Sequence, residues 1–195
     1  VATQTLREAR NRDVFLVKAK QILGFPIEVI AGREEARLIY LGVSHLLPQS
    51  AERRLVVDIG GRSTEMILGQ QETASTMESY RVGSVAWSMK YFRQGQLDEA
   101  AFDQAEIAAK AILDEALSRC PRNAWDVAYG SSGTVGAVGD ILSVAGWSQG
   151  IIDREGLTWL KRCMLRAQHT DKLRLEGLKE DRRAVIGGGV SVLMA

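Results

Sequence analysis

The feature that most constrains the fold is an apolar run at residues 55–59 (LVVDI), which ends abruptly in the glycine-rich stretch 60–63 (GGRS). A continuous run rich in β-branched residues is typical of a strand that is buried on both faces. A second strand is predicted directly afterwards, at residues 65–69. The two runs therefore predict a hairpin whose turn is rich in glycine.

Helix and strand patterns alternate along the rest of the chain. Asp98 and Asp153 are expected to begin two of the helices, Gly24 to end another, and Gly187-Gly188-Gly189 to interrupt the last. Helices are predicted up to residue 23 and at 33–47, 84–92, 98–119, 135–145, 153–165 and 180–194, with further strands at 27–30, 77–82 and 125–129. This order of elements predicts an α/β fold.

Composition excludes several classes of protein. The chain has 195 residues, 25 Lys and Arg against 24 Asp and Glu, and a net charge of +1, which supplies no overall field to hold nucleic acid or an anionic membrane. Cys120 and Cys163 form neither a disulfide framework nor a zinc ribbon. Because no apolar run reaches the ~18 residues that span a bilayer and no signal pattern is present, a cytoplasmic protein is expected. The missing initiator Met and the apolar C-terminal stretch indicate a piece of a longer polypeptide.

Two glycine-rich segments are candidate phosphate sites, and the first lies between Asp58 and Glu65. Glycines allow backbone N–H groups to approach phosphate oxygens, and two carboxylates could hold Mg²⁺ directly or through water. The alternative is an ordinary hairpin turn in which the glycines supply positive φ and Asp58 caps the bend.

The second segment, residues 130–134 (GSSGT), lies between a predicted strand and a predicted helix. Free N–H groups at the start of a helix bind anions without a basic residue. The alternative is that Ser132 or Thr134 serves only as an N-cap.

Glu34 and Glu35 begin another predicted helix. Carboxylates in a first turn offset the helix dipole, which accounts for both residues without any catalytic role. Beside bound phosphate and metal, such a carboxylate could instead orient and deprotonate an attacking water. The spacing alone leaves both interpretations open.

Taken together, four stretches closely resemble the exopolyphosphatase / guanosine pentaphosphate phosphohydrolase family, namely residues 5–7 (TLR), 32–39 (GREEARLI), 56–65 (VVDIGGRSTE) and 130–134. The similarity keeps the family's order and spacing over nearly the whole chain. It implies the actin-like ATPase fold, with two ribonuclease-H-like domains and phosphate held in the cleft between them. Residues 1–37 would form the C-terminal part of the first domain, and residues 38–195 the second domain without its last strand and helix.

The resemblance also implies roles for individual residues. Glu35 would be the catalytic base that activates water, and Asp58 and Glu65 would hold the metal. Hard oxygen ligands favour Mg²⁺ there, with Mn²⁺ as the alternative. Substrate would be bound by Arg7 and by the two loops, that is by Gly60, Gly61, Ser63 and Thr64 and by Ser132, Gly133 and Thr134.

The chain departs from the family pattern in three places. Arg62 stands where the family usually has Gly or Ala, so that a long cation lies in the first loop. Gly187-Gly188 replaces the usual Pro-Gly before the closing helix. The family's own first phosphate loop (DxGSNS) would precede Val1, so activity is expected of the complete protein rather than of this piece.

The expected reaction is attack of water on the terminal phosphoryl group of inorganic polyphosphate, with release of orthophosphate. The alternatives are hydrolysis of guanosine pentaphosphate in the stringent response and a non-catalytic sensor of guanosine phosphates. The motifs do not separate the two substrates, because both end in the same phosphoanhydride. No nucleic-acid or membrane partner is indicated, and the family resemblance implies a homodimer.

Overall fold

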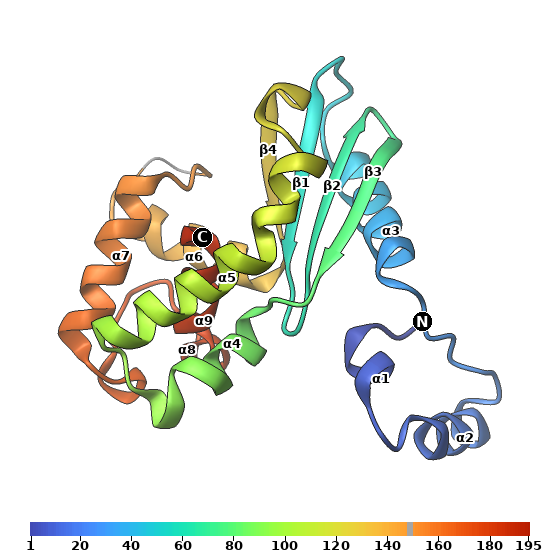
Figure 1. Ribbon diagram of the computed structural model, residues 1–195, viewed down its shortest axis with the longest axis horizontal. Helices are drawn as coiled ribbons and strands as arrows, with labels where there is room; N and C mark the ends of the chain where they lie inside the picture. Colours follow the sequence, from blue (N-terminus) through green and yellow to red (C-terminus); the bar gives the residue numbers. More distant parts are fainter. Residues whose placement is uncertain (148–149) are drawn as a thin grey trace.

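The computed structural model describes residues 1–147 and 150–195, and a four-stranded sheet of order β3-β2-β1-β4 lies at its centre (Figure 1). The strands are β1 (Arg53–Ile59), β2 (Thr64–Gln70), β3 (Thr73–Tyr80) and β4 (Val127–Ser131). The β1–β2 and β2–β3 pairs are antiparallel, whereas β1 and β4 are parallel. A parallel pair needs a long crossover, which here contains the helices α4 (Ser84–Tyr91) and α5 (Glu99–Arg119). The expected α/β class is therefore confirmed.

Helices cover both faces of the sheet (Figure 1). On one face, α3 (Gly32–Leu46) packs Ala36 and Tyr40 against Val56 and Ile67. On the other face, the largest apolar cluster joins the sheet to α4, α5, α6 (Ser132–Val144), α7 (Arg154–Ala167) and α9 (Ile186–Met194). Burial on both sides explains the unbroken apolar run of β1.

Capping residues begin or end three of the helices where the sequence predicts. The Asp98 carboxylate accepts a hydrogen bond of 2.8 Å from the Ala101 amide, and the Asp153 carboxylate accepts one of 2.7 Å from the Gly156 amide. Gly24 ends α2 (Arg12–Leu23) with φ of +80°. Such a positive φ is costly for residues with a Cβ atom, so the glycine stop is confirmed with its physical cause.

Three predicted elements differ from the structure. The strand expected at residues 27–30 is reduced to one isolated bridge between Ala2 and Val29, and β3 begins four residues before the expected position 77. The turn expected at residues 130–134 is absent, because β4 continues to Ser131 and α6 begins at Ser132.

The last helix is interrupted in a different place from the predicted one. The break lies at residues 184–185, between α8 (Glu180–Arg183) and α9, and the three glycines lie inside α9. A Cβ atom on Gly188 would lie 2.3 Å from the Ser84 carbonyl oxygen, and one on Gly189 would lie 2.6 Å from a methyl carbon of Thr134. The glycines therefore allow α9 to approach α4 and α6 closely, rather than breaking the helix.

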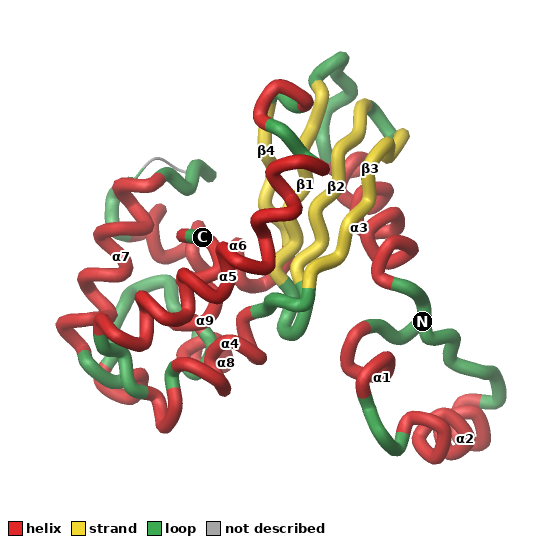
Figure 2. Tube along the Cα trace, in the orientation of Figure 1, coloured by secondary structure: helices red, strands yellow, loops and turns green. Residues whose placement is uncertain are grey.

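Residues 1–30 lie beside the N-terminal end of α3 and contain α1 (Gln4–Glu8) and α2 (Figure 2). The domain boundary predicted after Arg37 falls inside α3, which runs without interruption through that position. The division into two ribonuclease-H-like domains stays a prediction about the longer protein.

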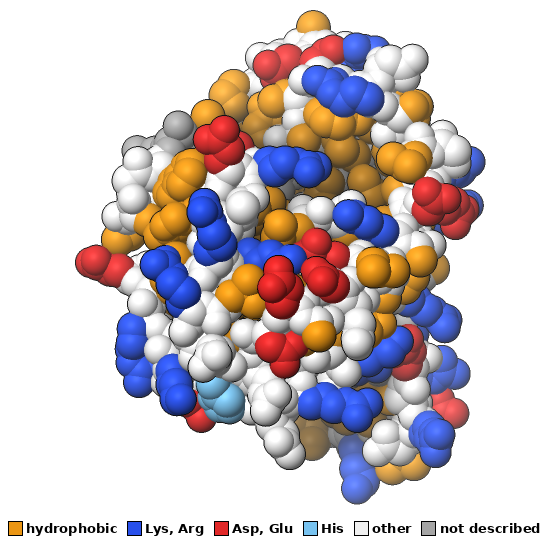
Figure 3. Space-filling model, turned by 60° about the vertical axis from the view of Figure 1, so that its left-hand side comes forward, with side chains coloured by type: hydrophobic (Ala, Val, Ile, Leu, Met, Phe, Trp, Pro, Cys, Tyr) orange, Lys and Arg blue, Asp and Glu red, His pale blue; other side chains and the backbone are white. Residues whose placement is uncertain are grey.

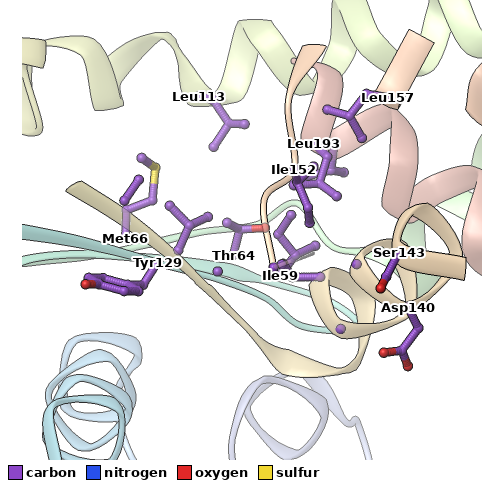
Figure 4. A pocket seen from close by; sticks show the side chains of 18 residues that line it. Ile59, Thr64, Met66, Leu113, Tyr129, Asp140, Ser143, Ile152, Leu157 and Leu193 are labelled. Carbon is purple, nitrogen blue, oxygen red and sulfur yellow. The ribbon is translucent and has the colours of Figure 1, made fainter. Parts of the chain in front are cut away.

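An apolar cavity of about 750 Å³ lies between the sheet and helices α5, α6, α7 and α9. Four side chains point into it from the helical side (Figure 4), namely Leu113, Ile152, Leu157 and Leu193. On the face of the molecule drawn in Figure 3, hydrophobic side chains gather in the upper half. Among the described residues, no helix combines the length and the apolar character that crossing a bilayer requires.

Candidate active site

Strand register places four polar residues in one row across the sheet. Ser79 of β3 is paired with Glu65 of β2, Glu65 with Asp58 of β1, and Asp58 with Ser131 of β4. Residues directly opposite one another on neighbouring strands project from the same face, with Cβ atoms about 4.5–5.5 Å apart. Two carboxylates and two hydroxyls therefore converge on one side of the sheet.

Glu35, from the first turn of α3, brings a third carboxylate to this row. Burial raises the pKa of Glu65 to about 7, and the negative charges of Glu35 and Asp58 add to the rise. Hydrogen bonds to Glu65 from the Ser79 hydroxyl, at 2.7 Å, and from Ser63 act in the opposite direction. Burial also raises the pKa of Asp58, and here too the charge of Glu35 adds to the effect. The predicted set Glu35, Asp58 and Glu65 is thus brought together.

Two of these carboxylates, Asp58 and Glu65, have the chemistry that suits a hard divalent cation. Glu65 is only 1% exposed, and within the described ranges neither Glu65 nor Asp58 forms a salt bridge with a Lys or Arg side chain. The same residues contain no group of three or more His, Cys, Asp or Glu side chains arranged to hold a metal. Mg²⁺ commonly takes one or two protein carboxylates and completes its shell with water and substrate phosphate, which matches Asp58 and Glu65.

Arg7 fixes the orientation of Glu35. Its guanidinium donates from Nε to the Gln4 side chain at 2.8 Å, from Nη1 to the Ile30 carbonyl at 2.7 Å and from Nη2 to Glu35 Oε2 at 2.9 Å. The side chains of Arg7 and Glu35 are 19% and 17% exposed. Arg7, expected to bind substrate, is thus engaged with the proposed base.

The two adjacent glutamates have different surroundings. Glu34 forms an exposed ion pair with Arg37 one turn further along α3. Glu35 points instead to Arg7 and the carboxylate row. The helix-dipole interpretation is sufficient for Glu34, but it does not account for the placement of Glu35.

The first loop is a tight turn braced by α4. The Gly60 amide donates to the Ser63 carbonyl at 2.9 Å, and the Gly60 and Gly61 carbonyls accept hydrogen bonds from the first turn of α4. Neither glycine has positive φ, so the alternative in which they only supply that conformation is wrong. Among the described residues, the N–H groups of 61–63 donate no hydrogen bond. Consecutive free N–H groups form a cradle for an anion.

Two of the predicted loop residues point away from this cradle. Thr64 is 1% exposed, and its hydroxyl donates to the Val82 carbonyl at 2.6 Å. Side chains alternate along a strand, so Thr64 must face the side opposite to Glu65. Thr134 is likewise buried, with its methyl group against Gly189 of α9. The Thr64 hydroxyl is therefore not available as the expected donor to substrate. The Thr134 side chain packs against α9, so the expected contact of Thr134 with substrate stays a prediction that concerns its backbone N–H group in the first turn of α6.

The second loop is the start of α6. Ser132 has φ of +77°, and its hydroxyl donates to the Ile59 carbonyl at 2.7 Å, which ties α6 to the end of β1. The N-cap residue is Ser131, and it makes no side-chain capping bond, so the N-cap alternative for Ser132 or Thr134 is wrong. The bond to Ile59 and the pairing of Ser131 with Asp58 place this helix start beside the first loop. The first N–H groups of a helix lack intrahelical acceptors and can bind an anion there.

Two polar residues near the site, Ser79 and Arg182, were missed by sequence reasoning, whereas Ser131 lies within the predicted segment 130–134. Ser79 reaches the site through the register of β2 and β3, which the sequence does not specify directly. Arg182 enters through packing of α8, because a Cβ atom on Gly133 would lie 2.7 Å from the Arg182 guanidinium carbon. No motif in the sequence predicts this contact between Arg182 and the start of α6.

Comparison with known proteins agrees with this arrangement. The model of the Ppx/GppA phosphatase family matches residues 1–195. The chain belongs to the Ppx/GppA phosphatase family. Among curated Ppx/GppA relatives, it is 45% identical over 195 residues to "Guanosine-5'-triphosphate,3'-diphosphate pyrophosphatase" of Vibrio campbellii. That alignment covers all of this chain but 39% of the relative, so the chain spans about two fifths of the relative's length.

Solved structures of Ppx/GppA proteins have the same fold. An exopolyphosphatase-like protein matches with a TM-score of 0.84 at 25% identity, covering 99% of this chain and 64% of that one. The Aquifex aeolicus family member matches with a TM-score of 0.72 at 23% identity, covering 99% of this chain and 63% of that one. The family resemblance read from the sequence is confirmed.

Proposed function

We propose that the full-length protein is a metal-dependent hydrolase that releases the terminal phosphate of guanosine pentaphosphate. The observation that carries the hydrolase assignment is the meeting of Glu35, Asp58 and Glu65 between two sets of free backbone N–H groups. The name of the Vibrio relative supports the nucleotide as substrate. Guanosine pentaphosphate thus replaces inorganic polyphosphate, the substrate expected from the sequence, as the first choice.

The chain's own residues can perform most of the reaction. The free amides of the two loops bind the phosphate oxygens, and Glu35 orients a water molecule toward the terminal phosphorus. The water oxygen forms a new P–O bond, its proton passes to Glu35, and the bridging P–O bond breaks to release orthophosphate. Phosphoryl transfer of this kind depends mainly on positioning and charge neutralisation. When bound at Asp58 and Glu65, Mg²⁺ would neutralise charge on the phosphate oxygens.

The contacts of Glu35 suit the role of a base. Arg7 holds Oε2, whereas Oε1 takes part in no hydrogen bond among the described residues. One oxygen is therefore fixed while the other remains for water.

The test compares two variants of adjacent residues in the full-length protein. With Mg²⁺, Glu35→Gln is expected to lower phosphate release from guanosine pentaphosphate by about 10²–10⁴-fold, the usual loss for a general base. Glu34→Gln is the matched control, since Glu34 lies in the same helical turn but pairs with Arg37 on the surface. Equal rates for the two variants would overturn the assignment of Glu35.

The same assay decides the substrate. We expect faster release of phosphate from guanosine pentaphosphate than from long-chain polyphosphate. The reverse preference would identify the protein as an exopolyphosphatase. Tight nucleotide binding without release from either substrate would instead identify a sensor.

A further inference from the structure

Arg62 lies in the first phosphate loop and reaches across to α1. Its Nε and Nη2 atoms are 3.0 Å and 2.9 Å from Glu8 Oε2 at the end of that helix. The side chains of Arg62 and Glu8 are 42% and 32% exposed. The cation next to the free amides of 61–63 is therefore held by one oxygen of a partly solvated carboxylate.

Arg7 and Arg62 differ in how firmly they are held. Arg7 uses Nε and both terminal nitrogens on Gln4, Ile30 and Glu35, and its side chain is 19% exposed. Arg62 is more exposed, and its only salt bridge among the described residues is to Glu8. Exposed ion pairs contribute little to stability, because solvent screens them. Arg62 can consequently change partners at much lower cost than Arg7.

The negative charge of Glu8 would keep other stabilising contacts if Arg62 bound a different group. Its other oxygen, Oε1, accepts a hydrogen bond of 2.7 Å from the buried Gln4 side chain. The hydrogen bonds of Arg62 and Gln4 and the nearby charge of Arg81 hold the pKa of Glu8 below its ordinary value. With Gln4 and Arg81 still in place, the carboxylate keeps two of its stabilising neighbours.

A phosphate is the natural competitor for this guanidinium. Arginine binds phosphate through two parallel hydrogen bonds, and a polyphosphate brings more charge than one carboxylate. We propose that Arg62 is a substrate-binding residue that exchanges Glu8 for a phosphate group of the bound substrate. This inference rests on the proposed function, since it requires a phosphate chain at the first loop.

The exchange predicts effects of opposite sign for the two partners. Glu8→Gln removes the competing charge but keeps an acceptor for Gln4, so the affinity for inorganic tripolyphosphate with Mg²⁺ should rise by about three- to fivefold. Arg62→Gln removes the binding group, so the affinity should fall by about tenfold or more. In the double variant, Glu8→Gln should bring no gain, because its effect acts through Arg62.

Isothermal titration of the full-length protein provides the test, and another ion pair provides the control. Arg53 and Asp126 are paired with similar exposure, 50% and 48%, at the opposite end of β1. Arg53→Gln and Asp126→Asn should leave tripolyphosphate affinity unchanged, and thermal melting of every variant checks its folding. Weaker binding of tripolyphosphate by the folded Glu8→Gln variant would show that the Arg62–Glu8 ion pair only stabilises the fold. That result would overturn the proposed exchange.

A gain from Glu8→Gln that persists without Arg62 would also overturn it. Either of these two results would reject the exchange but not the proposed function, provided that the wild-type protein binds tripolyphosphate. Absence of any wild-type binding would reject the phosphate site itself, and the exchange with it.

Discussion

Glu65 makes the stability of the protein depend on pH in an unusual direction. Its pKa is raised from 4.5 to about 7 by burial, and the folded protein therefore holds a proton that the unfolded chain has lost between these two values. The contribution of Glu65 to stability is therefore greatest below pH 4.5, falls as the pH rises toward 7, and stays at the lower level above it. One pH unit corresponds to about 1.4 kcal/mol, so the whole effect is on the order of 3 kcal/mol.

Glu65→Gln isolates this effect, because glutamine does not titrate. The variant has a constant offset from its own packing and hydrogen bonds, which does not change with pH. We expect its stability relative to wild type to increase by about 2–3 kcal/mol between pH 5 and pH 8, by the same linkage. Nearly all other titrations are common to both proteins and cancel in the comparison.

Urea denaturation in the presence of a chelator measures the difference at each pH. The chelator matters, because a divalent cation would stabilise the ionised carboxylate and conceal the cost of burying it. A difference in stability that stays constant from pH 5 to pH 8 would refute the reasoning. So would a difference that changes in the opposite direction, since it would place the pKa of Glu65 below that of the unfolded chain.

Two further predictions concern cation binding and helix packing. The affinity of the full-length protein for Mg²⁺ should fall by about tenfold per pH unit below pH 7, because Glu65 must lose its proton to bind the ion; equal affinities by titration at pH 6 and pH 8 would exclude Glu65 as a ligand. Gly188→Ala should destabilise the protein by about 2 kcal/mol or more, since its Cβ atom would lie 2.3 Å from the Ser84 carbonyl. Gly136→Ala, where nothing lies within 4 Å of the added atom in α6, should instead stabilise by about 0.5–1 kcal/mol in urea denaturation; similar losses in both variants would contradict the packing argument.

The sequence predicts local elements better than their pairing. The β1–β2 hairpin and the ends of α2, α5 and α7 follow from apolar patterns and capping residues that act within a few positions. Ser79 could not be placed in the site, because its neighbour Glu65 is 14 residues away and is reached only through the register of β2 and β3. Arg182 depends in the same way on the packing of a short helix against α6.

For two of the wrong predictions, the sequence itself contains a signal toward the observed structure. Thr64 and Glu65 are adjacent in a strand, so if Glu65 faces the site, Thr64 cannot. Gly187-Gly188-Gly189 lies within an otherwise apolar helical pattern, and small residues there can signal close helix packing as well as a break. Which of the two applies depends on α4 and α6, whose positions the local pattern does not contain.

The row of polar residues across the sheet also explains why the site lowers the stability of the fold. A central strand pair places Asp58 directly beside Glu65, and burial raises the pKa of both, so each resists ionisation at the place where a cation would need it charged. Ser79 and Ser131 offset part of this loss by hydrogen bonding to the two carboxylates, whereas Arg7 bonds to the carboxylate of Glu35 and to neither of these two. An arginine placed between Asp58 and Glu65 would remove the cost, but it would also occupy the position that a divalent cation needs. The uncompensated pair is thus the part of the structure in which stability and the proposed chemistry are most directly opposed.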